Sequence, residues 1–179
     1  CPSTTEDAYG LLRSAIEDPD PVLIVENLPI YWTKGPKPSS DHRVPLGKAK
    51  VVVPGTDVTI VSYSRTALES LGALQALGEA GISAEVIDLR TIQPWDQETV
   101  LASVEKTGRL LIAHEAVMQF GAGAEIAAVV QEKLFGKLHA PVMRVGAPFN
   151  PVPFAKPLEN EHVVNAAKIA EAAIKLVKG

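Results

Sequence analysis

The sequence predicts an α/β fold of three layers, with a mostly parallel sheet and helices on both faces. Short apolar runs alternate along the chain with amphipathic stretches long enough for several helical turns. Continuous apolar runs suit strands that are buried on both faces, and the amphipathic stretches suit the crossover helices that parallel strands need. Glycine follows several of these stretches, at the position where it ends a helix.

The elements are expected in a regular order. The predicted strands are 58–61, 84–89, 110–113 and 142–145. The predicted helices are 67–80, a helix capped by Asp96 that ends near Gly108, 122–135, and an amphipathic helix that closes the chain between 163 and 177. Four prolines between Pro148 and Pro157 predict an extended stretch before the closing helix.

The first 28 residues predict one helix and one strand outside this sheet. Ser3-Thr4-Thr5-Glu6 has the spacing of a capping box, and Asp18-Pro19-Asp20-Pro21 ends the helix. Val22–Val25 predicts a strand buried on both faces. One helix and one strand cannot bury their own apolar surface, so we expect the end of a truncated domain, joined by a proline-rich linker at 29–46. The start at Cys1, in what reads as a loop, also suggests a fragment.

Composition excludes several classes of function. The chain is 46% hydrophobic and 21% charged, with a net charge of −4, which gives no indication of nucleic-acid binding. A single cysteine excludes an intrachain disulfide and a cysteine-rich metal site. No apolar run is long enough to span a membrane, and the histidines lack compact metal-ligand spacing.

His114 and Glu115 are the most informative pair, because they follow the predicted strand 110–113. Ligands of open parallel sheets gather at the carboxyl ends of strands, and glycines such as Gly121 and Gly123 let backbone N–H groups approach an anion. The functional interpretation is a histidine and a carboxylate facing a cleft. The structural alternative is a tightly packed turn, and it is favoured because the glycines lack the rest of a phosphate-loop motif.

Three further groups have both a functional and a structural interpretation. Ser64 follows a strand as a nucleophile could, but it is expected to cap the next helix, and Asp88 is expected to pair with Arg90. The helix end before Asp18 and Asp20 combines free carbonyls with carboxylates, which are ligands that suit a cation. The alternative at that helix end is a solvated stop signal.

Several segments together resemble the beta subunits of thiamine-diphosphate-dependent 2-oxo acid dehydrogenases. They occur in order and at family-like spacing over nearly the whole chain. The clearest are Pro2-Ser3-Thr4-Thr5-Glu6-Asp7-Ala8-Tyr9-Gly10, Val44-Pro45-Leu46-Gly47-Lys48-Ala49, Glu85-Val86-Ile87-Asp88-Leu89-Arg90-Thr91-Ile92, Phe120-Gly121-Ala122-Gly123-Ala124-Glu125-Ile126 and Pro151-Val152-Pro153-Phe154-Ala155. Gln119-Phe120-Gly121 makes the resemblance closest to the decarboxylating component of pyruvate dehydrogenase.

The resemblance implies a domain organisation and an activity. Residues 1–28 would be the last helix and strand of a truncated pyrimidine-binding domain, 29–46 a linker, and 47–179 a transketolase C-terminal-like domain. The full enzyme would decarboxylate a 2-oxo acid and transfer the acyl group to a lipoyl arm. Thiamine diphosphate and Mg²⁺ would be bound outside this chain, so no residue here is expected to be catalytic or to bind the cofactor, and the fragment is expected to be inactive alone.

The resemblance also implies ligands and partners. A potassium ion would be held by the carbonyls of Ala15 and Ile16 with Asp18 and Asp20. The partners would be a second beta subunit, an alpha subunit and the lipoyl acyltransferase, with no nucleic acid and no membrane. The residues expected at partner surfaces are Glu115, Phe120, Gly121, Gly123, His139 and Gly179. His139 stands where some family members have an acid, which puts acyltransferase docking by that contact in doubt.

Two alternatives and the location remain open at this point. The chain could be the C-terminal domain of another thiamine enzyme, a transketolase or a deoxyxylulose-phosphate synthase. It could also be a free-standing module that binds a small anion at the Gly121 loop. The expected location is the cytoplasm in a bacterium, and the mitochondrial matrix or a plastid in a eukaryote.

Overall fold

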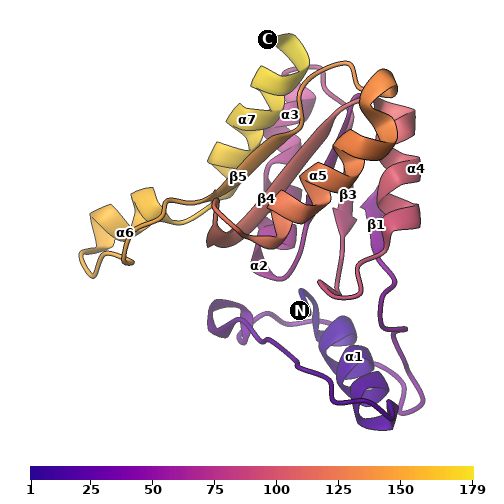
Figure 1. Ribbon diagram of the computed structural model, residues 1–179. Coiled ribbons are helices and arrows are strands. Elements are labelled where there is room, and N and C mark those ends of the chain that lie inside the picture. The colour runs from indigo at the N-terminus through magenta and orange to yellow at the C-terminus, as the bar shows by residue number, and fades with distance from the viewer.

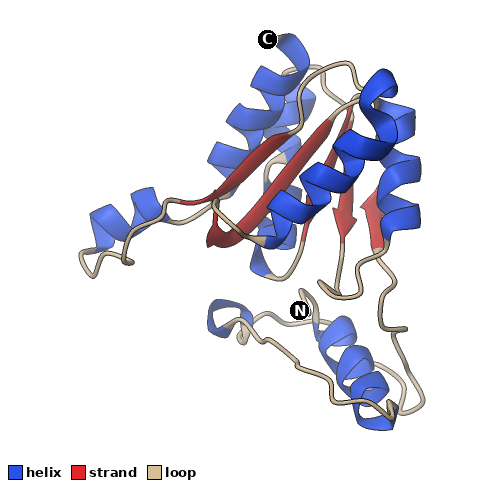
Figure 2. Cartoon of the chain, viewed as in Figure 1, coloured by secondary structure: helices blue, strands red, loops and turns tan.

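The computed structural model describes residues 1–179 and divides into two regions. Residues 47–179, called the sheet domain below, form a sheet with helices on both faces (Figures 1 and 2). Residues 1–46, called the N-terminal segment, contain one helix and long irregular stretches, and they lie beyond one end of the sheet. The predicted fold class is confirmed.

The sheet has five strands in the order β1-β3-β2-β4-β5. They are β1 (Lys50–Val53), β2 (Val58–Ser62), β3 (Ala84–Asp88), β4 (Leu110–Val117) and β5 (Met143–Ala147). β1 is antiparallel to β3, and all other pairs are parallel. β1 is not predicted from the sequence, because this short edge strand adjoins the linker and has no helix between it and β2.

Helices cover both faces of the sheet (Figure 1). On one face lie α2 (Arg65–Gly72), α3 (Leu74–Glu79) and α7 (Ala166–Lys178), and on the other lie α4 (Gln97–Thr107) and α5 (Ala122–Leu134), which the short η2 (Phe135–Lys137) follows. Successive residues of a strand point to opposite faces, so Ile60 belongs to the first core and Val61 to the second. No helix combines the length and the apolar character needed to cross a membrane.

The helix boundaries follow local signals in the sequence. The Asp96 side chain accepts from the Thr99 amide at 3.2 Å at the start of α4. Gly108 ends that helix with a φ of 67°, in the left-handed region that glycine tolerates best. The single helix predicted at 67–80 is two helices, α2 and α3, interrupted at Ala73 directly after Gly72, a poor helix former.

The prediction of an extended stretch through Pro157 is wrong at its end. Residues 148–155 form no helix or strand, but α6 (Lys156–His162) follows and lies away from the sheet and its covering helices (Figure 1). Pro157 lies in the first turn of α6, where a missing N–H costs no hydrogen bond. The closing helix α7 starts at Ala166, and the Asn165 side chain accepts from the Lys168 amide at 3.0 Å.

The N-terminal segment holds α1 (Thr5–Glu17) and the short η1 (Leu28–Ile30). Thr4, and not Ser3, caps α1, because its hydroxyl accepts from the Asp7 amide at 3.1 Å. The predicted capping box is therefore one residue too early. The helix ends before Pro19, as predicted.

The strand predicted at Val22–Val25 is wrong. These residues form no strand, their backbone groups make no backbone hydrogen bond, and Leu23 is 87% exposed. No strand of the chain lies beside them. An apolar run becomes a buried strand only where a neighbouring strand supplies partners for its backbone.

Candidate functional site

The carboxyl ends of β2, β3 and β4 form one edge of the sheet, called the carboxyl edge below. The N-terminal segment lies beyond this edge (Figure 1). Ligands of open parallel sheets bind at the same position. Here two acidic side chains of the edge, Asp88 and Glu115, contact Ser3 and Asn27 of the N-terminal segment. The candidate site is therefore an interface within the chain.

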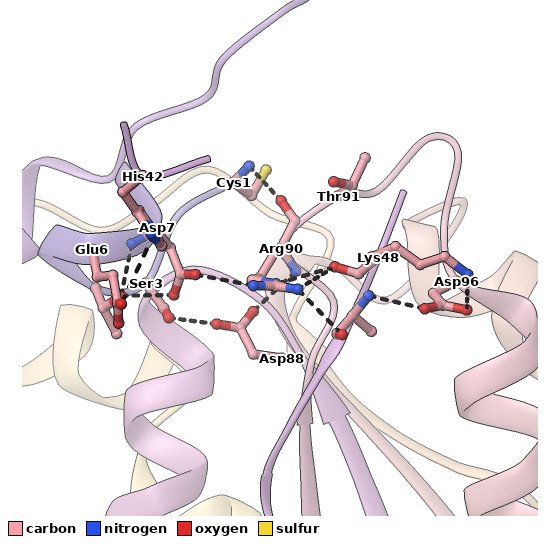
Figure 3. Close-up of polar contacts among 12 residues, drawn as sticks. Cys1, Ser3, Glu6, Asp7, His42, Lys48, Asp88, Arg90, Thr91 and Asp96 are labelled. Carbon is pink, nitrogen blue, oxygen red and sulfur yellow. Dashed lines mark hydrogen bonds and ion pairs between the residues drawn. The ribbon is translucent and has the colours of Figure 1, made fainter. Parts of the chain in front are cut away.

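Asp88, at the end of β3, forms the first contact (Figure 3). The Ser3 hydroxyl donates to its Oδ2, and the Arg90 amide donates to its Oδ1 at 3.1 Å. Only 1% of Asp88 is exposed. Burial, with a smaller contribution from the nearby carboxylate of Asp7, raises the pKa of Asp88 to about 6, against the two hydrogen bonds and the charge of Arg90.

The predicted ion pair between Asp88 and Arg90 is wrong, because the guanidinium of Arg90 reaches α1. Its Nη1 lies 3.3 Å from Asp7 Oδ1, and its Nη2 donates to the Lys48 carbonyl at 2.8 Å. Arg90 has a φ of 56°, which is uncommon for a residue with a side chain. The ammonium of Cys1 donates to the Arg90 carbonyl at 2.8 Å. Two neighbouring carboxylates are thus held by different atoms of one arginine.

Glu115, near the end of β4, forms the second contact. The Asn27 side-chain amide donates to its Oε2, and Arg65 Nη1 donates to its Oε1 at 3.0 Å. Arg65 also pairs with Glu69 at 3.1 Å, and Glu69 accepts from the Ala166 amide at 3.0 Å, at the start of α7. Polar contacts therefore link the N-terminal segment through Glu115 to the C-terminal helix.

His114 does not face a cleft, contrary to the functional interpretation of the sequence. β4 continues past it to Val117, and the side chain is completely buried. Its Nδ1 lies 2.9 Å from the Ala116 carbonyl, and its ring stacks on Tyr63 with centroids 6.3 Å apart. Burial lowers the pKa of His114, and the charge of Arg144 lowers it further. A buried neutral ring at this position is a packing element.

The glycines near β4 make room for this ring. A Cβ at Gly123 would lie 2.5 Å from His114 Nε2, and one at Gly146 would lie 2.9 Å from its Cε1. Gly121 is also close, at 3.0 Å from Cε1. The space that could have admitted an anion is therefore filled by the imidazole. The prediction that Ser64 caps the next helix is wrong: Ser64 precedes α2 but makes no side-chain capping hydrogen bond, and the Thr66 hydroxyl donates to the Tyr63 carbonyl at 2.8 Å.

Asp18 and Asp20 lie at the end of α1, beside a groove that also touches Leu46 and the loop 90–94. The Asp20 amide donates to Asp18 Oδ1 at 3.0 Å. The carbonyls of Ala15 and Ile16 are in the last turn, where the helix offers them no donor. No three His, Cys, Asp or Glu side chains of the chain converge so as to hold a metal ion.

The residues expected at partner surfaces lie in several places. Phe120 is 99% exposed and has a φ of 57°. The loop after β5 adjoins it, because the Met118 amide donates to the Ala147 carbonyl at 3.0 Å. That loop and α6 carry more exposed apolar side chains, namely Phe149, Val152, Phe154 and Leu158. His139 packs instead against Gly108, to whose carbonyl its amide donates at 2.8 Å, and Gly179 ends α7.

Most of the carboxyl-edge contacts join residues that are far apart in the sequence. Ser3 and Asp88 are 85 positions apart, and Asn27 and Glu115 are 88 apart. No spacing rule reaches that far. The signal that was available was the position of Asp88 and Glu115 at the ends of predicted strands.

The chain is similar to known proteins over its whole length. The model of the transketolase C-terminal domain matches residues 47–169. The beta subunit of acetoin:2,6-dichlorophenolindophenol oxidoreductase from Cupriavidus necator is 43% identical over 179 residues, which is 100% of this chain and 53% of that protein. The beta subunits of the pyruvate dehydrogenase E1 component from Drosophila melanogaster and Bacillus subtilis are 43% and 42% identical, over 99% of this chain and 50% and 54% of theirs.

Solved structures give the same fold. A split-gene transketolase, described as an inactive beta4 tetramer, has a TM-score of 0.79 and 26% identity over 98% of this chain and 55% of its own. A transketolase mutant from Pichia stipitis has a TM-score of 0.51 and 18% identity over 73% of this chain and 18% of its own, a likeness of fold alone. The chain thus spans about half the length of the curated relatives that it matches.

Proposed function

Because the chain belongs to the family of transketolase C-terminal domains, we propose that it forms part of the beta subunit of a 2-oxo acid dehydrogenase. The observation that carries the proposal is identity of 42–43% over 99–100% of the chain to beta subunits of such enzymes and of an acetoin oxidoreductase. The whole enzyme would decarboxylate the 2-oxo acid and pass the acyl group to a lipoyl arm.

Pyruvate is the proposed substrate. The Cupriavidus necator subunit named for acetoin and the Drosophila melanogaster subunit named for pyruvate are both 43% identical to this chain. Gln119-Phe120-Gly121 favours pyruvate, as the sequence resemblance implies. A branched 2-oxo acid and acetoin are the substrates to test beside it.

The proposed role of residues 1–179 is assembly. Exposed Phe120, Phe149 and Phe154 form apolar surface of the kind that is buried between subunits. The proposed partners are a second beta subunit, an alpha subunit and the lipoyl acyltransferase. A structural neighbour that covers 98% of this chain forms a beta4 tetramer, which supports self-association.

Thiamine diphosphate is the cofactor that the relatives imply, and when bound it supplies an electron sink for decarboxylation. The residues of this chain do not fit its diphosphate or Mg²⁺. Asp88 and Glu115 are engaged by the N-terminal segment, and His114 fills the space beside the glycines. No metal-holding cluster is present. The cofactor would be held by other parts of the enzyme, and no catalytic step is assigned to this chain.

Two proposals concern the N-terminal segment. Residues 1–28 would end a pyrimidine-binding domain, in which Val22–Val25 would find a neighbouring strand. The exposure of Leu23 and the unpaired backbone around it support this. The free carbonyls of Ala15 and Ile16, together with Asp18 and Asp20, would hold a potassium ion with a further ligand from outside this chain.

The potassium proposal can be tested in the whole beta subunit. Asp20→Ala should raise the K⁺ concentration needed to reach full thermal stability, with Na⁺ at equal ionic strength as the control. An unchanged K⁺ dependence would exclude the site.

The proposed location is the cytoplasm of a bacterium, or the mitochondrial matrix or a plastid of a eukaryote.

The main test is an activity measurement on the assembled enzyme. The complete reading frame is expressed with an alpha subunit, and turnover of pyruvate, a branched 2-oxo acid and acetoin is followed with 2,6-dichlorophenolindophenol as electron acceptor. Pyruvate should be turned over fastest, and residues 1–179 alone should be inactive. Turnover of acetoin alone would contradict the proposed substrate.

A second candidate is another thiamine enzyme, a transketolase or a deoxyxylulose-phosphate synthase. The split-gene transketolase neighbour favours it, but at 26% identity against 43% for the dehydrogenase subunits. Ketol transfer between sugar phosphates, without 2-oxo acid oxidation, would establish this alternative. The anion-binding module is not supported, since the imidazole of His114 occupies the glycine-lined space.

A further inference from the structure

Helix α1 meets the end of β3 through ionisable groups that are almost completely buried (Figure 3). Asp7 of α1 is 3% exposed and Asp88 of β3 is 1% exposed. The guanidinium of Arg90 joins the two regions, because it bonds Asp7 and the carbonyl of Lys48. This joint contains two carboxyl groups and one arginine.

The charges of the joint do not balance at Asp88. Arg90 forms its ion pair with Asp7 at 3.3 Å, whereas the direct partners of Asp88 are the Ser3 hydroxyl and a backbone amide, which are neutral. The ammonium of Cys1 donates to the Arg90 carbonyl and not to a carboxylate; burial lowers its pKa, and the nearby charges of Asp88 and Asp7 oppose that shift. A buried carboxyl with neutral partners and a second carboxylate nearby favours its protonated form.

Other charged groups around the joint are engaged elsewhere. The ammonium of Lys48 lies 4.0 Å from Asp96 and 3.9 Å from Glu98, on the side away from α1. On the opposite side, Glu6 lies 4.0 Å from the imidazole of His42. None of these groups contacts Asp88.

We propose that this joint is a proton-linked latch, in which α1 docks on the end of β3 with uptake of a proton by Asp88. Docking of α1 buries Asp88 and brings Asp7 beside it. Undocking returns Asp88 to water, where the ionised carboxylate is stable. A rise in pH through about 6 therefore loosens α1, while the sheet domain stays folded on its own two cores.

The direction follows from the titration of Asp88. Its pKa is about 6 in the docked state, against 3.8 for an ordinary aspartate, so the docked state binds the proton more tightly. Docking is strongest below about pH 4, weakens as the pH rises through 6, and is constant above that. A difference of this size changes the docking equilibrium by up to about 100-fold.

Amide hydrogen exchange tests the latch in the chain as it stands. Protection of residues 5–17 is measured between pH 4.5 and pH 8, corrected for the intrinsic pH dependence of exchange and compared with amides of β2. In the wild type, protection of α1 should fall by more than tenfold over this range while β2 changes less. Asp88→Asn, which keeps the shape and cannot ionise, should abolish that fall.

Asp96→Asn is the matched control. Asp96 is also a buried aspartate. Burial alone would raise its pKa, but hydrogen bonds from Thr99 and Ala49 stabilise the carboxylate, and the pKa of Asp96 is lowered. This variant should weaken α4 at neutral pH and leave the pH profile of α1 unchanged. A flat α1 profile in the wild type, or an unchanged slope in Asp88→Asn, overturns the proposal.

A direct titration covers the case in which Asp88→Asn fails to fold. The carboxyl carbon of Asp88 in the wild type is followed by NMR from pH 3 to pH 8. Titration near 6 supports the latch, and titration at or below 4 overturns it.

Discussion

The sheet domain and the N-terminal segment are held in place by different forces. Nearly all buried hydrophobic residues belong to the sheet domain, and Leu11 and Val44 are the two that precede it. Hydrogen bonds and an ion pair join the N-terminal segment to the carboxyl edge, from Ser3 and Asp7 to Asp88 and Arg90, and from Asn27 to Glu115.

Apolar burial mainly stabilises the sheet domain, whereas the polar contacts mainly fix the position of the N-terminal segment. Apolar burial is non-directional and stabilises the sheet domain in proportion to the area removed from water. Buried hydrogen bonds and ion pairs add little net stability but penalise every misplaced arrangement. The N-terminal segment is thus positioned precisely and held weakly, and substitutions in the two regions should have effects of different size and kind.

The largest effect is expected in the core of the sheet domain. Leu111→Ala removes a side chain that is completely buried in β4, and it should lower the free energy of unfolding by about 2–5 kcal/mol. Leu23→Ala, in the exposed stretch of the N-terminal segment, should change it by less than about 0.5 kcal/mol. Urea denaturation measures the free energy of unfolding of both variants. Equal losses would contradict the difference between the two regions.

A smaller loss is expected where His114 meets the glycines. Gly123→Ala places a Cβ 2.5 Å from the imidazole and should cost about 1–3 kcal/mol through overpacking. Gly78→Ala, in a helix with no atom within 4 Å of the new Cβ, should stabilise by up to about 1 kcal/mol. Thermal unfolding should show a lower melting temperature for Gly123→Ala and a higher one for Gly78→Ala. Adding His114→Ala to Gly123→Ala should recover part of the lost stability.

At the joint, Arg90→Met should detach α1 without unfolding the sheet domain. It leaves Asp7 buried without its ion pair, and amide exchange in residues 5–17 should accelerate by about tenfold or more. Arg43→Met breaks the exposed pair with Glu17 and should change exchange by less than about threefold. Equal acceleration of β2 amides in Arg90→Met would show that the two regions unfold together.

The smallest pair of effects comes from the helix caps. Thr4→Ala and Asn165→Ala each remove a side chain that accepts from a helix-start amide, worth about 1 kcal/mol. Asn165→Ala should lower the stability of the sheet domain, whereas Thr4→Ala should speed amide exchange in α1 only. A loss of domain stability in Thr4→Ala would show that α1 supports the sheet more than its contacts suggest.

The sequence predicted what depends on local patterns. Residues within a few positions of one another predict four of the five strands. They also predict the Asp96 cap of α4 and the end of that helix at Gly108. The partners of Asp88 and Arg90 could not be predicted in that way, because they depend on how α1 packs on the sheet.

Two errors have the same physical origin. Val22–Val25 has the composition of a buried strand, but whether it becomes one depends on a neighbouring strand, and none of the five strands lies beside it. The sequence predicts that His114 lies beyond the strand, because a polar residue breaks an apolar run. β4 in fact carries it into the interior, where glycines on neighbouring elements make room for the ring.

The long separation between partners at the carboxyl edge has a consequence for synthesis. A ribosome makes Ser3 and Asn27 more than eighty residues before it makes Asp88 and Glu115. At about 5–20 residues per second, the N-terminal segment waits for several seconds with no surface of the sheet domain to bind. During that interval its apolar residues are exposed to chaperones and to other chains, so the time at which β3 and β4 emerge governs the fate of the segment.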